Sequence, residues 1–251
     1  HTTHVGSLPR SPELAALLIQ RDHGKPIDLA AFEALVCSEI EKAVRAQVEA
    51  GVSIVSDGEL GKVGYSTYIT ARLSGFGGHV DRTPAKDLAD LPELRTKLAA
   101  IMGSQSFVRA ACIGKVELVD SKPVEDDIRR FSAAMGKEGG KVRGFMNAAS
   151  PGLVTAFQPN QFYPTHEAYL ADLIEAMRPE YEAIIAAGFD LQLDAPDLAM
   201  AAHTGFQNLS EAEFLKRAEQ NVEALNAATA NIPPERMRMH ICWGNYEGPH
   251  D

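Results

Sequence analysis

The chain has 251 residues, of which 45% are hydrophobic and 23% charged, a composition typical of a globular protein with a full core. Its formal net charge of −10 excludes the basic surface on which binding to nucleic acids and to anionic membranes depends, so we expect neither partner. A membrane span is also not expected, because the sequence lacks a continuous apolar run of roughly 18 residues.

The first half of the chain predicts helices on either side of a turn and then one strand. Ser11 and Asp28 are typical N-cap residues. Apolar residues recur every three to four positions after Asp28, which predicts a long helix that ends near Gly51. The β-branched residues 52–56 predict a short strand. Residues 60–103 are rich first in glycine and then in polar residues, so we expect an excursion with a hairpin or short helices.

The second half continues the alternation of helix and strand. We expect strands at residues 111–119, 141–147, 189–193 and 237–244, a loop at 148–152, and helices opening at Pro123, Thr165 and the capping box of Ser210 and Glu213. The chain opens on His1 rather than Met, and residues 247–251 have the composition of a loop. We therefore expect the fold to be incomplete at both ends.

This alternation predicts a parallel sheet covered by helices. An internal echo supports it, because residues 50–57 and 187–194 both read Ala-Gly, a short apolar strand and then an acid. The absence of Gly-x-Gly-x-x-Gly after a strand argues against a dinucleotide-binding fold. We expect an α/β (β/α)8 TIM barrel as a single domain over residues 1–251, with one strand mostly before His1, five after residue 50, and the last ones beyond 251.

Polar residues cluster where the predicted strands end, which is the edge of a TIM barrel that carries its chemistry. They are Gly6, Ser7, Asp57, Glu59, Glu117, Asn147, Asp194, His240 and Cys242. Each has a plainer interpretation as well: Ser7 suits an ordinary turn, and Asp57 and Glu59 suit a helix cap or a solvated surface.

His240 and Cys242 are the candidate metal ligands. Side chains two apart on a strand share a face, and an imidazole with a thiolate suits zinc. The alternative is that a lone His-x-Cys is a weak motif and that a free cysteine is usually a small core residue. We expect core positions for Cys37 and Cys112, and the odd, widely spaced cysteines fit a reduced cytoplasm.

Four motifs together resemble the cobalamin-independent methionine synthase family, both its C-terminal catalytic barrel and its stand-alone single-barrel relatives. They are Thr2-Thr-His-Val-Gly-Ser-Leu-Pro9, Asp57-Gly-Glu59, Leu191-Gln-Leu-Asp-Ala-Pro196 and His240-Ile-Cys242. The resemblance implies a methyltransferase in which zinc activates the thiol of homocysteine as a thiolate that accepts a methyl group. It also implies that His240 and Cys242 bind the zinc, with a Glu and a second Cys beyond residue 251.

The same resemblance implies that homocysteine is held by Val5, Gly6, Ser7, Glu59 and Asp194. From its position at the same edge, His4 is a candidate catalytic residue. Two departures concern the methyl donor. Ala195 stands where the family has a Glu, and the loop at 148–152 lacks the family's Trp, so we do not expect a polyglutamylated methylfolate. His79, His166 and His203 are expected on solvated loops or helices.

Two alternatives remain open at this point. One keeps the zinc thiolate but transfers it to another electrophile, as relatives that join coenzyme M to epoxides do. The other is a barrel without competent zinc, resembling the uroporphyrinogen decarboxylases, or a binding protein for small acids.

Overall fold

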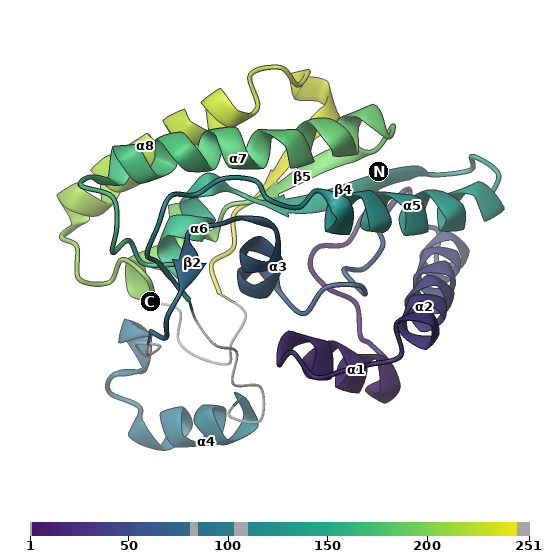
Figure 1. Cartoon of the computed structure of the whole chain (residues 1–251), viewed down its shortest axis with the longest axis horizontal. Helices are drawn as coiled ribbons and strands as arrows, with labels where there is room; N and C mark the ends of the chain where they lie inside the picture. The colour runs from purple at the N-terminus through teal and green to yellow at the C-terminus, as the bar shows by residue number, and fades with distance from the viewer. Residues whose placement is uncertain (1, 81–84, 103–109, 245–251) are drawn as a thin grey trace.

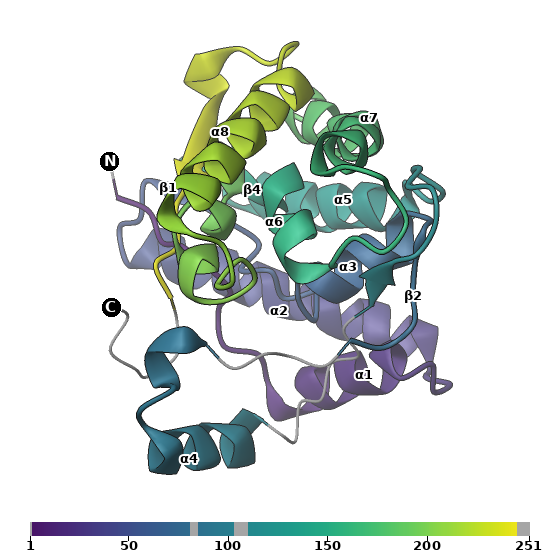
Figure 2. The same cartoon turned by 90° about the vertical axis from the view of Figure 1, so that its left-hand side faces the viewer.

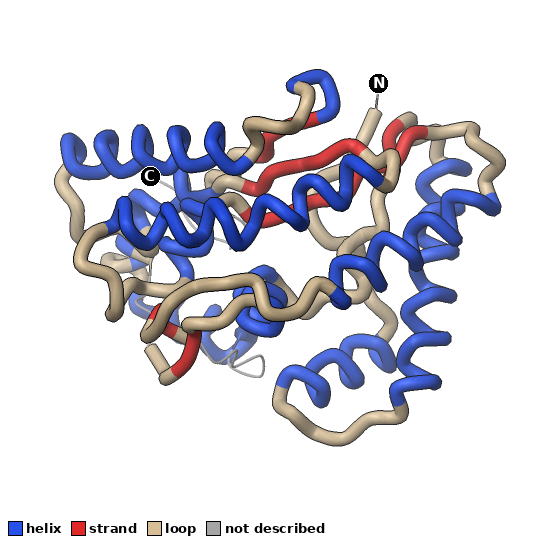
Figure 3. Tube along the Cα trace, turned by 45° about the horizontal axis from the view of Figure 1, so that its top comes forward, coloured by secondary structure: helices blue, strands red, loops and turns tan. Residues whose placement is uncertain are grey.

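The computed structural model describes residues 2–80, 85–102 and 110–244. Its main sheet has four strands, all parallel, in the order β1 (Ile54–Val55), β4 (Arg143–Ala149), β5 (Asp190–Asp194) and β6 (Met237–His240). Figure 3 shows these strands side by side in the middle of the molecule. The expected α/β class with a parallel, TIM-barrel-like sheet is confirmed, and the expected single domain over 1–251 stays a prediction.

Long helices cover the outer face of this sheet: α2 (Leu29–Glu49), α5 (Lys122–Lys137), α7 (His166–Ala186) and α8 (Glu211–Ala228) (Figure 1). The predicted caps are confirmed. Asp28 accepts hydrogen bonds from two backbone N–H groups, and Ser210 forms its capping box with Glu213. Thr165 caps α7, and Ser11 caps α1 (Pro12–Asp22). None of the described helices is long and apolar enough to cross a bilayer.

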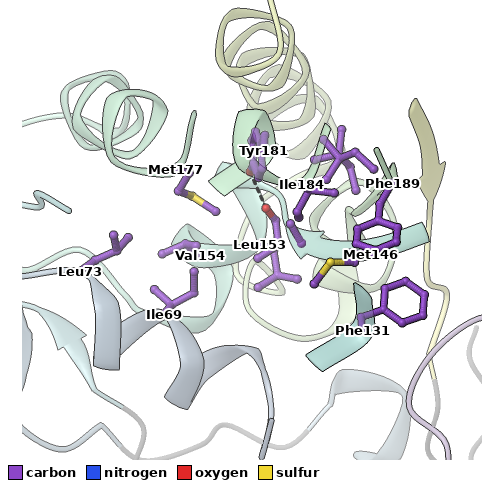
Figure 4. Close-up of a cluster of buried hydrophobic side chains, with 14 of the residues drawn as sticks. Ile69, Leu73, Phe131, Met146, Leu153, Val154, Met177, Tyr181, Ile184 and Phe189 are labelled. Atoms are coloured by element: carbon purple, nitrogen blue, oxygen red, sulfur yellow. Dashed lines mark hydrogen bonds between the residues drawn. The ribbon is translucent and has the colours of Figure 1, made fainter. Parts of the chain in front are cut away.

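The main core lies between the sheet and these helices. Alternate residues of β4 and β5, such as Met146 and Leu191, are buried against the helix residues Phe131 and Tyr181. Figure 4 shows this cluster and the hydrogen bond that the Tyr181 hydroxyl donates to the carbonyl of Ala149. The helices therefore cover one face of β4 and β5, and the other face of these strands lies toward the interior of the barrel-like sheet.

The expected strand at 111–119 is wrong. Only β3 (Ala111–Cys112) is a strand there, and it pairs antiparallel with β2 (Phe76–Gly77) rather than with the main sheet. Gly114 bends the chain close to Gly75, where a β-carbon would lie 2.6 Å from the Gly114 carbonyl. The excursion also contains α3 (Tyr65–Arg72), η1 (Lys86–Leu88) and α4 (Pro92–Met102), and Figure 2 shows α4 apart from the main body.

The expected loop at 148–152 is also wrong. Ala148 and Ala149 belong to β4, and Ser150 caps the buried helix α6 (Pro151–Phe157) by accepting from the Leu153 N–H. Short helical turns complete the described chain: η3 (Pro196–Leu198), η4 (Met200–His203) and η5 (Pro234–Arg236). The expected loop at 247–251 lies outside the described residues.

Candidate substrate site at the strand ends

The inner face of the sheet carries two rows of polar side chains near the carboxyl ends of its strands. The register places Asn147, Gln192 and Arg238 in one row across β4, β5 and β6, and it places Asp194 beside His240 in the row above. Since side chains two apart on a strand share a face, these two rows form a polar ladder that leads to the carboxyl ends of the strands.

Asn147 joins the two predicted carboxylates. Its side-chain N–H donates to Oδ2 of Asp194 at 3.3 Å, and it also hydrogen-bonds the carboxylate of Glu59. Gln192 donates to the other oxygen of Asp194 at 2.8 Å. All four side chains are buried. The structure therefore brings Glu59 and Asp194, which are 135 positions apart in the sequence, to the same amide group.

A strained turn presents Glu59. Its φ of 55° lies in the left-handed region, which costs a non-glycine residue roughly 1–2 kcal/mol. Asp57 accepts from the Glu59 N–H at 3.0 Å. The Arg10 guanidinium donates to the carbonyl oxygens of Glu59 and Lys62 at 2.7 and 2.6 Å. Arg10 follows directly on the Gly6–Pro9 segment, so one side chain secures the turn that carries Glu59.

Burial raises the pKa of Glu59 above its usual value. The positive charge of Lys62 and the hydrogen bond from Asn147 oppose this rise, while the negative charges of Asp57 and Asp194 add to it. The ionised Glu59 therefore bears a cost of burial and is repelled by the two neighbouring acids. A cationic ligand group placed between Glu59 and Asp194 would relieve both the repulsion and the cost of burial.

The residues Val5, Gly6 and Ser7 form a turn beside this site. Gly6 has a φ of 81°, which glycine adopts without strain, and the Leu8 N–H donates to the Gly58 carbonyl at 2.9 Å. Val5 and Ser7 are exposed. The turn is therefore fixed against the Asp57–Glu59 loop with its tip open to solvent, available to a ligand's carboxylate.

His4 is half-buried below the turn, with its Nε2 3.2 Å from the Ser56 hydroxyl. Burial lowers the pKa of its imidazole, and the nearby positive charge of Arg238 adds to this, although the Gly6 backbone opposes it. The neutral form is therefore favoured, as proton acceptance near neutral pH requires.

His240 and Cys242 lie next to this site. His240 is the last residue of β6 and pairs in register with Asp194, whose neighbour Ala195 donates its N–H to the His240 carbonyl at 2.9 Å. The strand expected to reach Gly244 ends at His240, so Cys242 lies just beyond it, where its carbonyl accepts from the Met200 N–H at 3.2 Å. Both side chains are half-buried.

Three sequence expectations about polar residues need correction. Glu117 is exposed and pairs with Lys115 at 2.7 Å, away from the strand ends, because residues 113–119 are not a barrel strand. His203 is buried, and His166 is half-buried between Asn221 and Arg217. Of the two expected core cysteines, Cys112 is fully buried but Cys37 is half-buried and donates to Glu33.

The structure adds four residues that the predicted substrate set omits: Arg10, Asn147, Gln192 and Arg238. The sequence indicates Asn147 only as a polar residue at the end of a predicted strand. The alternation of polar residues at 192 and 194 and at 238 and 240 was a usable signal, because a polar inner face repeats with a period of two.

A parallel sheet covered by helices defines a TIM-barrel-like protein, and its buried acids lie at the carboxyl edge of the strands, where proteins of that class usually bind their ligands. The family model described as "Cobalamin-independent synthase, Catalytic domain" matches residues 1–87. The chain is 25% identical over 246 residues to the methionine synthase of Pyrococcus furiosus, covering 98% of this chain and 62% of that protein.

A second relative is the 5-methyltetrahydropteroyltriglutamate–homocysteine methyltransferase of a Synechococcus species. It is 25% identical over 251 residues, and the match covers 98% of this chain and 29% of that protein. The solved structure of a B12-independent methionine synthase from a Shewanella species, in complex with selenomethionine, superposes with a TM-score of 0.64 at 20% identity over 97% of this chain and 61% of that one. These matches confirm the resemblance to the cobalamin-independent methionine synthase family. The chain spans 62% of the length of the Pyrococcus relative.

Proposed function

We propose that this chain supplies the substrate site of a zinc-dependent methyltransferase that methylates homocysteine, with zinc presenting the substrate's thiol as a thiolate. The observation that carries the proposal is the pair of buried carboxylates, Glu59 and Asp194, bridged by Asn147 and set beside His240. The names of the relatives, which include a homocysteine methyltransferase, support the same reading.

The site suits an amino acid that carries a thiol. Glu59 and Asp194 would receive its ammonium group, because a cation relieves the repulsion between two buried carboxylates. The backbone at Val5 and Gly6 and the hydroxyl of Ser7 would receive its carboxylate. This arrangement leaves the side chain of the amino acid free to extend along β6 toward His240 and Cys242.

The donor types of His240 and Cys242 fit zinc, which takes imidazole nitrogen and thiolate sulfur as ligands. Within residues 2–80, 85–102 and 110–244, no group of three or more His, Cys, Asp or Glu side chains is arranged to hold a metal ion. This pair would thus provide two ligands of the site. When bound, zinc would lower the pKa of the substrate thiol, and the carboxylates would hold the amino-acid end in place.

The test is to incubate the zinc-loaded protein with homocysteine and candidate methyl donors and to measure methionine. We expect methionine that depends on both zinc and homocysteine. A protein that binds zinc but forms no methionine with any donor would contradict the proposed transfer to homocysteine and favour another electrophile.

The metal assignment has its own test. Cys242→Ser should sharply lower the zinc content while leaving the circular dichroism spectrum unchanged, because Cys242 lies beyond the strand and is only half-buried. Cys37→Ser is the matched control, since Cys37 lies on α2 and should not affect zinc. Equal zinc content in wild type and Cys242→Ser would remove Cys242 from the site.

A further inference from the structure

Arg238 connects two parts of the candidate site that come from opposite ends of the chain. It stands on β6, two residues before His240, and its side chain crosses the inner face of the sheet. Its Nη1 donates to the Thr3 hydroxyl at 3.0 Å, and its Nη2 lies 3.5 Å from the His4 carbonyl. Thr3 and His4 lead directly into the Val5–Ser7 turn.

The guanidinium of Arg238 is held in place by two further contacts. Its Cζ lies 3.6 Å from the centroid of the buried Phe145 ring, an arrangement that fixes the plane of the guanidinium by cation–π attraction. Its Nε donates to Oε1 of Gln192 at 2.9 Å. The side chain therefore has one defined position rather than the many that an exposed arginine samples.

The bond to Gln192 also determines how that amide is oriented. Because the Gln192 oxygen accepts from Arg238, its nitrogen is left to donate to Asp194, which it does at 2.8 Å. A reversed amide would set its N–H group against the Arg238 N–H and its oxygen against the carboxylate. A continuous series of contacts thus runs from Asp194 through Gln192 and Arg238 to Thr3 and His4.

We propose that Arg238 is a positioning residue that sets the Val5–Ser7 turn and the Asp194 carboxylate at the spacing an amino-acid substrate requires. The assignment rests on the proposed function, since it presumes that the turn takes the substrate's carboxylate and Asp194 its ammonium. Arg238 does not touch the substrate in this scheme. It acts through Thr3 on one side and through Gln192 on the other.

The test compares Arg238→Met with Arg236→Met. Arg236 is the matched control because it precedes β6 by one residue and contacts Asp190 and the Phe189 carbonyl rather than the site. Two quantities are measured for each: hydrogen–deuterium exchange of the peptides covering residues 2–10 and 53–58, and the kcat and KM for homocysteine. The exchange reports the Leu8–Gly58 and Ile54–Thr2 backbone bonds and does not depend on any activity.

In Arg238→Met we expect exchange in both peptides to rise at least tenfold and the KM for homocysteine to rise at least tenfold, with kcat within about threefold of wild type. Arg238→Lys, which keeps the charge but not the forked geometry, should recover part of the KM. Arg236→Met should leave exchange in these peptides and the KM unchanged.

The outcomes separate the two proposals. Unchanged exchange in Arg238→Met overturns the positioning role whatever the activity, and so does faster exchange with an unchanged KM in an active enzyme. Faster exchange in a protein whose wild type makes no methionine supports the link between Arg238 and the turn and contradicts the proposed function alone.

Discussion

Arg10 joins the turn that carries Glu59 to the segment that follows Ser7, so Arg10→Met tests whether this side chain holds the site together. Its guanidinium donates to two carbonyl oxygens, those of Glu59 and Lys62, at 2.7 and 2.6 Å. Hydrogen bonds from a charged donor contribute about 1.5–3 kcal/mol each. Methionine keeps most of the apolar stem and removes both donors.

An opposing effect reduces the expected loss. The Nε–H of Arg10 is buried and has no acceptor among the described residues, and removing such a donor returns about 1–3 kcal/mol. The two bonds together contribute about 3–6 kcal/mol, so we expect Arg10→Met to lower the free energy of unfolding by about 2–3 kcal/mol, the middle of the range that remains after the opposing effect. Without the two Arg10 hydrogen bonds, the strained turn at Glu59 should relax, and the KM for homocysteine should rise several-fold.

Equilibrium unfolding in urea measures the first effect, with Arg45→Met as the matched control. Arg45 lies on α2 with an exposed side chain, and its ion pair with Glu138 is 4.0 Å long. Such a surface pair contributes about 0–1 kcal/mol, so its loss should scarcely change stability. If Arg10→Met lowers the free energy of unfolding no more than Arg45→Met does, the Arg10 hydrogen bonds do not hold the turn and the reasoning is refuted.

Three further predictions concern buried groups. Burial raises the pKa of Glu59, so its neutral carboxyl group favours the folded state below the ordinary pKa of 4.5, and this contribution to stability is lost as the pH rises and the group ionises. Glu59→Gln should therefore be more stable than wild type in urea unfolding at pH 8 but not at pH 4, and a pH-independent difference would contradict this. Burial lowers the pKa of His166 from 6.5 to about 4, so its contribution to stability is present above pH 6.5 and is lost as the pH falls toward 4. An NMR titration should show a neutral His166 ring at pH 5.5, and a measured pKa near 6.5 would contradict this prediction. A β-carbon at Gly152 would lie 2.0 Å from Oδ2 of Asp197, so Gly152→Ala should lower the unfolding free energy by about 1–3 kcal/mol, whereas Gly136→Ala, with open space around it, should not; equal thermal midpoints for the two would refute the steric argument.

Local chemistry explains why much of the fold was predictable. The caps at Ser11, Asp28 and Ser210 depend on side chains within three residues of the helix start, which the sequence displays directly. The strands β4 and β5 were also predictable, because each is a short apolar run that the sequence displays directly. The strand expected at 111–119 is wrong because Ala111 and Cys112 pair with β2 rather than with the main sheet, and no local pattern distinguishes the two partners.

The candidate site was predictable in part. The ends of the predicted strands point to Glu59 and Asp194, the family resemblance implies their role toward the substrate, and the register places Asp194 beside His240. The contacts of Asn147 and Arg238 could not be predicted, because they join residues between 46 and 235 positions apart and depend on which strands pair. The zinc, the methyl donor class and the cytoplasmic location stay predictions.

The most direct test is a crystal structure of the zinc-loaded protein with homocysteine, recorded with anomalous scattering at the zinc edge. We predict an anomalous peak within bonding distance of His240 and Cys242, the ligand's sulfur beside it, and its amino group between Glu59 and Asp194. A peak at other residues, or an amino group bound away from these two carboxylates, would contradict the account.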